Sequence, residues 1–516
     1  MGGGSREGEH TLQGVPEPVL APDASAAMKC PNRLRMSHRD APAFLSLWTG
    51  FRLADSSRAW LALFKIPIDG SMKALCSAAM AACSLWFGAA PGLLAQSFTF
   101  TTIAGSPGLA GANDGTNGAA RFDRPSGLAV DAATNIYLSD TSNDTIRKIS
   151  PLGTNWVVTT IAGIAGIQGA QDGTNGVATL NRPNGITVDS HGNLFVVDHY
   201  NFTIRKIAPV GTNWVVSTIA GLAGAGGSAD GTNSDARFRS PVGITIDAAD
   251  NLYVADTVNC TIRMIAFVGT NAVTTTMVGA PGNFGFLDGV GASAELDYPY
   301  DLTLGLSNDV YIADWGNNAI RRITPFHTNQ WGLTTIAGNS GAIGSADGPG
   351  AQAEFYFPNG IVADAAGNLY VTDQDNDTIR KLTPEGAGWV VSTIGGVPKV
   401  PGSADGTGAN ALFNRPWGIA VGPGGILYIA DFANDTVRMG VPAPPAGPPL
   451  RVSLNGNHVV LSWPASAAGF VVQETSSLSS SPTWNSVTNG WVAAGDQLFL
   501  TNAIEGASMF YRLKKQ

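Results

Sequence analysis

A repeat of about 58 residues restricts the fold of this chain more than any other feature. The most regular copies read P-x-G-I-x-V-D, then G-N-L-Y-V-x-D, then N-x-T-I-R-K-I, and a fourth alternating apolar pattern follows. Successive copies start 58, 58, 58, 59 and 58 residues apart. About four short strands per copy at this period are typical of a β-propeller. The prolines that open the six copies are Pro125, Pro183, Pro241, Pro299, Pro358 and Pro416.

Each copy is predicted to form four strands, which in the third copy are Gly243–Asp247, Asn251–Asp256, Thr261–Ile265 and Val273–Val278. Alternating apolar residues give each strand one side for packing against a neighbouring sheet. The sixth copy ends after its third strand, whereas an unpaired fourth-strand pattern, F-T-F-T-T-I-A, precedes the first copy at 98–104. We therefore predict an all-β fold, a six-bladed propeller over residues 96–441 whose last blade takes its outer strand from residues 98–104. This closure would leave no open terminal edge.

These motifs resemble the NHL repeat family of six-bladed propellers, in six copies over roughly residues 98–441. The resemblance implies the fold, but it does not imply one function. Some members of the family bind partners, and related six-bladed propellers include amidating lyases, lactonases and paraoxonase-like hydrolases. Fold alone does not choose among these functions.

The N-terminal region shares nothing with the repeat. Met72 and Lys73 begin an apolar stretch that ends in small residues at Ala95, which is the pattern of a secretory signal peptide over residues 72–95. We interpret residues 1–71 as a non-native, disordered upstream extension and Met72 as the true initiator. The alternative is a membrane anchor with a cytoplasmic tail, although Pro91 interrupts the stretch. The mature protein is then expected to lack a stable membrane span and to be secreted, periplasmic or at the cell surface.

A second, smaller domain is predicted at the C-terminus. Residues 442–449 form a proline-rich linker, which is expected to be stiff and extended. Short strand patterns between Gly, Ser and Asn turns follow over residues 450–516, and they predict a small β-sandwich of the immunoglobulin or fibronectin-III type. The final F-Y-R-L resembles the modules that end many secreted bacterial proteins. Surface attachment, carbohydrate binding, a sorting role and an inert module all stay open for it.

Composition and charge restrict the kinds of molecule that this protein can bind. Only 13% of residues are charged, while glycine reaches 64 and proline 30, as suits a turn-rich all-β protein. Residues 1–95 hold nine Lys/Arg and seven Asp/Glu, so the remainder has 21 basic and 32 acidic residues, a net charge of −11. Such a surface repels phosphate backbones and excludes general nucleic-acid binding. Cys260 is the one cysteine after residue 95, so no disulfide is expected there.

Several polar residues recur in every copy and are therefore interpreted as scaffold, since a catalytic residue is needed once. The aspartates after the second strand are predicted to cap turns by accepting backbone N–H groups, and the arginines of the third strand are predicted to make structural contacts. The Asp-Gly pairs between copies lack the calcium-loop ligand pattern and are predicted to be glycine turns. The N-x-T sequences are predicted to be turn residues and not glycosylation sites. These columns are Asp140, Asp198, Asp256, Asp314, Asp373 and Asp431; Arg147, Arg205, Arg263, Arg321, Arg380 and Arg438; Asp114, Asp172, Asp230, Asp288, Asp347 and Asp405; and Asn143, Asn201, Asn259, Asn376 and Asn434.

The histidines do not form a metal-ligand pattern. His191, His199 and His327 are the histidines of the repeat region, and they occupy three different repeat positions. The resemblance to amidating lyases implies a central zinc held by histidines, and the resemblance to lactonases implies a central calcium held by Glu, Asn and Asp. Neither ligand set can be placed on this sequence. We therefore predict no catalytic residue, no metal ligand and no cofactor, with calcium or zinc in the central channel kept as the alternative.

Departures from the repeat point to a binding surface. Strand alternation places the turn between the second and third strands, the long crossovers and the P-x-G segments at one end of the propeller, where variable residues form the likeliest recognition surface. Aromatic residues gather at these positions, and an aspartate replaces the expected glycine at residue 301. Aromatics contribute strongly to interfaces, although they could instead pack on neighbouring turns. The predicted binding residues are His199, Tyr200, Tyr300, Asp301, Trp315, Trp417 and Phe432.

Two functions of different classes follow. The first is a secreted binding scaffold for a protein, peptide or glycan, active through one loop face and expected to be a monomer. The second is a metal-dependent hydrolase or lyase, lactonase-like or amidating-lyase-like, with its site in the central channel. The sequence favours the first and leaves open whether the chain is an enzyme. It names neither the ligand nor the partner.

Overall fold

The computed structural model describes residues 97–327, 330–339, 341–443, 450–455, 458–465, 470–475, 483–487, 490–495, 497–503 and 510–515. The predicted upstream extension at 1–71, the signal peptide at 72–95 and most of the linker at 442–449 lie outside these ranges. Within them the helices are short 3-10 turns, and none has the length and apolar character needed to span a membrane.

Six antiparallel sheets of five strands each account for residues 98–442. We number them 1 to 6 in the order of the repeats that open at Pro125 to Pro416. The innermost strands are β3 (Pro125–Val130), β8 (Pro183–Val188), β13 (Ile244–Ile246), β18 (Pro299–Leu304), β23 (Pro358–Ala363) and β28 (Pro416–Val421). The second strands are β4 (Ile136–Asp140), β9 (Leu194–Asp198), β14 (Leu252–Asp256), β19 (Val310–Asp314), β24 (Leu369–Asp373) and β29 (Leu427–Asp431).

The outer part of each sheet contains three further strands. The third strands are β5 (Thr145–Leu152), β10 (Thr203–Val210), β15 (Thr261–Val268), β20 (Ala319–His327), β25 (Thr378–Glu385) and β30 (Thr436–Pro442). The fourth strands are β6 (Asn155–Ala162), β11 (Asn213–Gly221), β16 (Asn271–Val278), β21 (Gln330–Ala337), β26 (Gly388–Gly395) and β1 (Phe98–Gly105). The outermost strands are β2 (Gly115–Thr116), β7 (Gly173–Thr174), β12 (Gly231–Thr232), β17 (Gly289–Val290), β22 (Gly348–Pro349) and β27 (Gly406–Thr407).

Short 3-10 turns connect these strands. Those between the second and third strands are η2 (Thr141–Asn143), η3 (His199–Asn201), η5 (Thr257–Asn259), η8 (Gln374–Asn376) and η11 (Phe432–Asn434). Those after the outermost strands are η1 (Asn117–Ala119), η4 (Asn233–Asp235), η6 (Gly291–Ser293), η7 (Gly350–Gln352) and η9 (Gly408–Asn410), and η10 (Pro423–Gly425) follows β28.

The innermost strands close a circle. Each one contacts the innermost strands of two neighbouring sheets, in the order β3, β8, β13, β18, β23, β28 and back to β3. The sheets therefore surround a common axis, which is the arrangement of a β-propeller.

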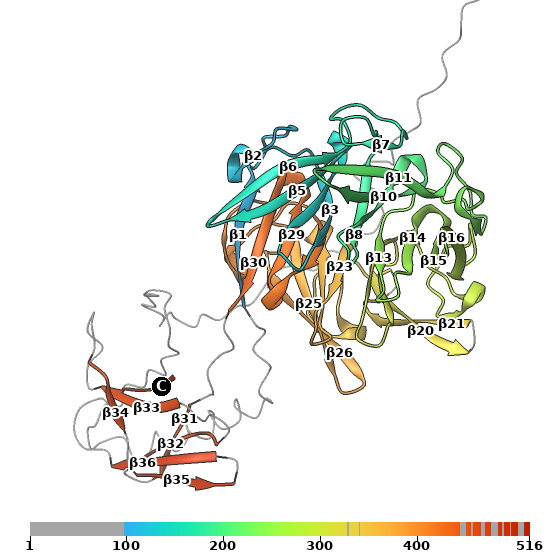
Figure 1. Ribbon diagram of the computed structural model, residues 1–516. Coiled ribbons are helices and arrows are strands. Elements are labelled where there is room, and N and C mark those ends of the chain that lie inside the picture. The colour runs from blue at the N-terminus through green and yellow to red at the C-terminus, as the bar shows by residue number, and fades with distance from the viewer. Residues whose placement is uncertain are drawn as a thin grey trace, which may run out of the picture. The chain divides into compact units, whose positions relative to one another are not determined.

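The two ends of the repeat region meet in sheet 6, as predicted. Strand β1 pairs with β30 along Phe98 to Gly105, so the N-terminal strand, drawn in blue, lies beside the last repeat, drawn in orange (Figure 1). The rings of Phe98 and Phe100 are fully buried, and Phe100 makes an edge contact with Phe413 at 5.1 Å between ring centroids. Apolar burial thus reinforces the closure.

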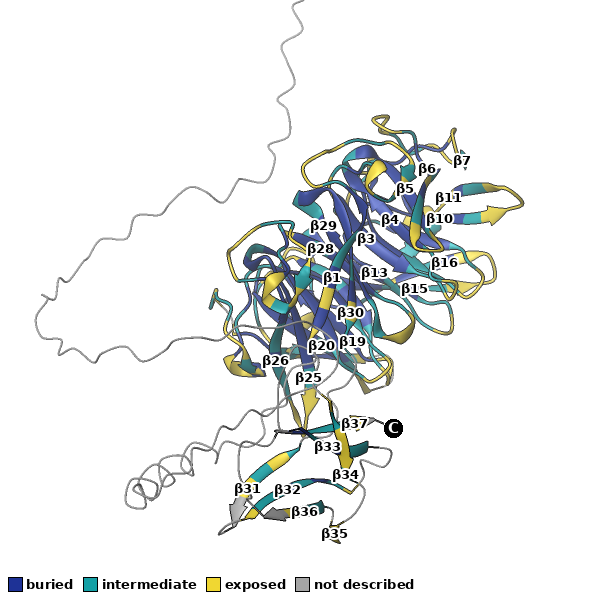
Figure 2. Ribbon diagram, turned by 90° about the vertical axis from the view of Figure 1, so that its left-hand side faces the viewer, coloured by how far each residue is buried: buried dark blue, intermediate teal, exposed yellow. Residues whose placement is uncertain are grey.

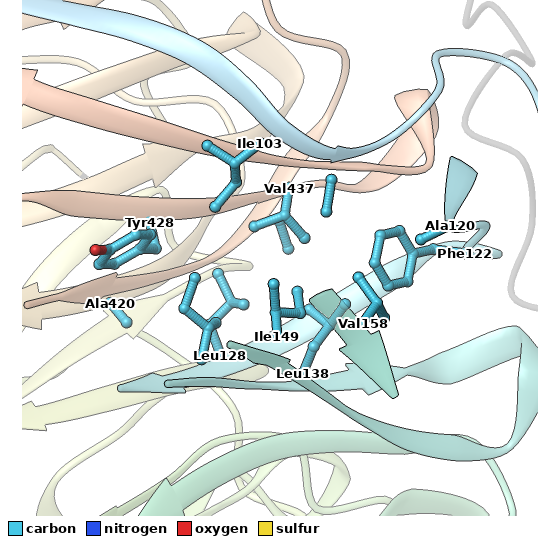
Figure 3. Packing of buried hydrophobic residues seen from close by; sticks show 13 residues of the cluster. Ile103, Ala120, Phe122, Leu128, Leu138, Ile149, Val158, Ala420, Tyr428 and Val437 are labelled. Atoms are coloured by element: carbon cyan, nitrogen blue, oxygen red, sulfur yellow. The ribbon is translucent and has the colours of Figure 1, made fainter. Parts of the chain in front are cut away.

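Apolar side chains fill the space between neighbouring sheets. Between sheets 1 and 6, Leu138 and Ile149 lie opposite Tyr428 and Val437 (Figure 3). The strands are mostly buried, whereas exposed residues gather in the loops and hairpin tips (Figure 2). A tryptophan near the start of the fourth strand also reaches a tyrosine of the preceding sheet, as Trp214 does with Tyr137 at 5.9 Å. The same contact joins Trp156 to Tyr428 and Trp389 to Tyr311, so these tryptophans pack neighbouring sheets together.

Each sheet also contains one fully buried arginine held by two aspartates. In sheet 3, Arg263 Nη1 donates to Asp256 Oδ2 at 2.8 Å, and Nη2 donates to Asp230 Oδ1 at 2.7 Å. Asp256 also accepts the side-chain amide of Asn259 and the backbone N–H of Arg239. Desolvation raises the pKa of Asp256 to about 6, although its backbone hydrogen bond and Arg263 act in the opposite direction. The two aspartate contacts recur at Arg147, Arg205, Arg321, Arg380 and Arg438.

Three sequence predictions need correction. Each sheet has five strands and not four, because the two residues after each Asp of an Asp-Gly pair add a short outermost strand. The aspartates of the second strand do not cap the turn that follows them; Asp256 accepts an N–H from the crossover 17 residues upstream. The Asp-Gly aspartates are more than turn residues, since Asp230 binds both Arg263 and the backbone N–H of Thr276.

The C-terminal residues form two further sheets. Their strands are β31 (Arg451–Asn455), β32 (His458–Pro464), β33 (Phe470–Thr475), β34 (Asn485–Val487), β35 (Trp491–Ala494), β36 (Gln497–Ala503) and β37 (Phe510–Lys515). The strand orders are β31-β32-β36-β35 and β34-β33-β37. One hydrophobic cluster contains Leu461 and Trp463 from the first sheet and Val472 and Tyr511 from the second. The fibronectin-III-like assignment stays a prediction.

The Asp256→Asn variant should lose about 3–5 kcal/mol of unfolding free energy, because it leaves the buried Arg263 without its fully buried counterion. The matched control is Asp230→Asn, whose side chain is 50% exposed; it should lose about 1 kcal/mol or less. Denaturant unfolding measures both. Equal losses for the two variants would contradict the importance of the buried pair.

Candidate binding face

One end of the propeller collects the variable segments. The first residue of the innermost strand pairs with the last residue of the second strand, as Pro299 does with Asp314. Crossover loops reach the same end, since the N–H of Gly224 binds the carbonyl of Asn201 in η3. We call this end the crossover face. The geometry therefore places the predicted binding residues at one end of the molecule.

A cavity of about 210 Å³ lies along the propeller axis. Residues of all six innermost strands line it, and most of them are Leu, Ile, Val, Ala or Gly. Asp301 is the one charged residue of this lining. The polar lining residues are Asn184, Thr187, Thr245, Tyr300, Thr303 and Asn359, with Trp417 beside them.

A continuous aromatic cluster occupies the mouth of this channel. The rings of Trp315 and Phe357 stack at 3.9 Å between centroids, and Trp315 also stacks on Tyr300 at 5.1 Å. Tyr300 contacts Trp417 at 5.7 Å, and Trp417 stacks on Phe432 at 4.5 Å. We define the aromatic cluster as Tyr298, Tyr300, Trp315, Tyr356, Phe357, Trp417 and Phe432.

Tyr300 and Trp417 contact each other at one end of the channel. Tyr300 lies on β18 and Trp417 on β28, and β23 stands between these two strands in the circle. Their contact therefore crosses above the end of β23, at the channel mouth. Burial raises the pKa of Tyr300 to about 12, so its hydroxyl is a neutral donor at physiological pH.

Comparison of the sheets shows that the scaffold does not require these aromatics. At the first position after the second strand, Thr141 donates its hydroxyl to the carbonyl of Pro183, and Thr257 donates likewise to Pro299, both at 2.8 Å. These bonds join neighbouring sheets. Trp315 occupies the same position in sheet 4, and its indole N–H is buried without a partner among the described residues. Phe432 holds this position in sheet 6 and has no donor.

His199 has the scaffold role that its repeat position implies. Its Nδ1 lies 2.8 Å from the carbonyl oxygen of Pro241, the counterpart of the two threonine bonds. A carbonyl accepts only from a protonated nitrogen, so Nδ1 carries the hydrogen, and burial lowers the pKa of the imidazole. The adjoining Tyr200 is 44% exposed and lies 5.9 Å below the Arg182 guanidinium.

Asp301 replaces a glycine that the other sheets need for close packing. A Cβ at Gly360, for example, would lie 2.4 Å from the carbonyl oxygen of Trp417. In sheet 4 the strand pairing already resumes at Asp301, opposite Ala313, and the side chain is accommodated. Its Oδ2 accepts the N–H of Ile361 on β23 at 3.1 Å. Desolvation raises the pKa of Asp301 to about 7, against the effect of two backbone N–H groups.

The sequence prediction missed part of the cluster. Tyr298, Tyr356 and Phe357 belong to it but were not predicted as binding residues. Tyr298 and Phe357 precede the prolines of their copies, where three other copies have Arg124, Arg182 and Arg415. The same comparison of copies would therefore have found them.

In the ranges the structure describes, no three His, Cys, Asp or Glu side chains are grouped as a cation site. Cys260 is buried and unpaired with another cysteine in those ranges.

The fold and its channel define a β-propeller, and the comparisons give its repeat type. The NHL repeat family model matches residues 180–207 and 413–438, so these two segments are similar to that repeat. The chain is 27% identical over 327 residues to Protein SUPPRESSOR OF QUENCHING 1, chloroplastic, from Arabidopsis thaliana, covering 61% of this chain and 30% of that protein. It is 28% identical over 306 residues to NHL repeat-containing protein 2 from Gallus gallus, covering 53% and 41%. The chain thus spans well under half the length of these relatives.

Solved structures share the fold. One is a protein of unknown function from Bacteroides thetaiotaomicron, with a TM-score of 0.51 and 21% identity, covering 67% of this chain and 76% of that one. Another is an auxiliary nutrient binding protein from Bacteroides ovatus, with a TM-score of 0.51 and 18% identity, covering 68% and 78%. At these identities the likeness concerns the fold alone.

The scaffold role of His199 can be tested by substitution. His199→Thr should keep nearly the full stability, because threonine makes the equivalent bond in sheets 1 and 3. His199→Ala should lose about 1 kcal/mol, since the carbonyl of Pro241 then lacks its partner. Thermal and denaturant unfolding measure the difference. An alanine variant as stable as the threonine variant would contradict the assignment.

Proposed function

We propose that this protein is a six-bladed NHL propeller that acts as a secreted binding scaffold, with the six sheets as its blades. The crossover face recognises a protein, peptide or glycan. The observation that supports this proposal is the aromatic cluster at the channel mouth, where two of its rings, Trp315 and Phe432, stand in place of inter-sheet hydrogen bonds.

The cluster has the properties of a recognition surface. Aromatic rings supply large contact areas at low entropic cost, and they dominate the energetics of many interfaces. Tyr298 is 42% exposed, and Trp315, Trp417 and Phe357 are part-buried, so their rings are supported from below and retain free surface. Flat ring faces suit both sugar rings and apolar peptide side chains.

The remaining features of the proposal come from the sequence. The signal-peptide pattern at 72–95 supports secretion to the periplasm, cell surface or medium, and the acidic repeat region supports a partner other than nucleic acid. The propeller is proposed to act as a monomer. The C-terminal residues 450–516 are proposed to form a fibronectin-III-like module for attachment or sorting.

Substitution of Trp315 and Trp417 by alanine should abolish capture of the native partner. Loss of central aromatic anchors should weaken binding by about 2 kcal/mol or more, roughly 30-fold. The matched control is Phe326→Ala, an aromatic residue 55% exposed at the opposite end of β20. Binding is measured by capture of the partner from the native environment and on a glycan array. The unfolding midpoint of each variant shows whether it is folded. Unchanged capture by the tryptophan variant would remove the crossover face from consideration.

One observation favours a second candidate, a metal-dependent hydrolase or lyase. Asp301, Asn184 and Asn359 line the same cavity, and carboxylate and amide oxygens are the donors that calcium prefers. However, Asp301 Oδ2 already accepts the N–H of Ile361, and the amide of Asn359 donates to Gln374.

Metal analysis of the mature protein, joined to a lactonase and esterase screen before and after chelation, tests this candidate. The binding proposal predicts neither a stoichiometric metal nor turnover. Calcium at one ion per chain, with turnover that chelation abolishes, would establish the enzyme instead.

A further inference from the structure

The channel contains a charge without a counterion. Asp301 is the one charged residue among the residues that line the cavity. Its carboxylate is held by backbone N–H groups and by no arginine or lysine of the described chain. A buried carboxylate is costly unless a positive group or hydrogen-bond donors compensate it.

Two cationic side chains of the crossover face contact other groups. Arg415 Nε lies 3.4 Å from Asp375 Oδ1, and the Arg182 guanidinium lies over the ring of Tyr200. The buried arginines are each bound by two aspartates, as Arg321 is by Asp314 and Asp288. A bound cation would supply the positive charge that the described chain does not place beside Asp301.

Aromatic faces surround the route to this carboxylate. Tyr300 directly precedes Asp301, and Tyr300 and Trp417 both line the cavity while touching each other across its mouth. Trp315 stacks behind Tyr300. The faces of such rings attract cations, most strongly where water is excluded.

We propose that the channel mouth binds an ammonium group, with Asp301 as its counterion and Tyr300 and Trp417 as its aromatic walls. The cavity of about 210 Å³ is smaller than typical ligand pockets, which measure roughly 300–1,000 Å³. It therefore takes a head group, a primary or quaternary amine, while the rest of the ligand lies on the aromatic cluster. This inference rests on the proposed function and narrows its ligand to an organic cation.

Binding should also depend on pH. The strands packed against β18 are β13, β14, β19 and β23. Their ionisable residues are Asp256 and Asp314, each paired with an arginine, and Tyr253 and Tyr311, whose raised pKa values keep them neutral. Ionisation of Asp301 is thus the change expected near pH 7. Affinity for a cation of fixed charge should fall as pH drops below about 7.

Calorimetric titration of the mature protein tests the inference with simple probes. Choline is compared with its uncharged isostere 3,3-dimethyl-1-butanol, and n-butylamine with n-butanol. The wild type should prefer each cation by at least about tenfold, and Asp301→Asn should lose that preference along with the pH dependence of choline binding. The charge-matched control is Asp375→Asn, which changes the crossover face outside the channel and should keep the preference.

Two substitutions of Tyr300 distinguish the contribution of its aromatic ring to binding from that of the Asp301 charge. Tyr300→Phe retains the ring and should bind choline as the wild type does, whereas Tyr300→Leu should bind it about tenfold more weakly. Equal affinity for charged and uncharged probes, or an unchanged preference in Asp301→Asn, would overturn the inference. If partner capture still requires Trp315 and Trp417 in that case, the binding face stands and its ligand is not a cation.

Discussion

The buried ion-pair network is the interaction on which this structure depends. Each sheet places a fully buried arginine between an aspartate of its second strand and an aspartate of the crossover, as Arg263 lies between Asp256 and Asp230. The network joins the second strand, the third strand and the incoming crossover of one sheet. Removing the fully buried aspartate would leave the buried arginine largely uncompensated, so each sheet needs this pair intact. Hydrophobic clusters between neighbouring sheets hold these units together.

Because the ion-pair network holds each turn, the turn positions outside the network can vary between sheets. The aspartate and asparagine of each turn are buried in the network. The residue directly after the aspartate, Thr257 in sheet 3, makes one hydrogen bond to the next sheet. One such bond contributes about 1 kcal/mol. Trp315 and Phe432 can therefore replace it, because stacking on Phe357 and Trp417 compensates for its loss. The candidate site arises where the scaffold can tolerate departures from the repeat.

Asp301 differs from the aromatic residues because it replaces a glycine of the scaffold. A side chain at the matching glycines would strike the neighbouring strand, as Gly360 would strike the carbonyl of Trp417. In sheet 4 the aspartate side chain accepts the N–H of Ile361 on β23, and its other oxygen lies against Gly243. The substitution of glycine by aspartate thus places a carboxylate on the channel wall. Beside it, the rings of Tyr300 and Trp417 meet across the channel mouth.

The sequence alone determined the period, the pairing of the first strand with the last repeat and the scaffold role of the repeated Asp, Asn and Arg columns, because these depend on local patterns that recur. It also located Tyr300, Asp301, Trp315, Trp417 and Phe432 as departures from the repeat. It could not give the partners of Asp230 or of His199, since both bonds join segments distant in the chain. Only the tertiary structure decided which departures meet: closing the circle of sheets brings residues from the fourth, fifth and sixth copies into one aromatic cluster, and sequence spacing does not encode distance across a ring.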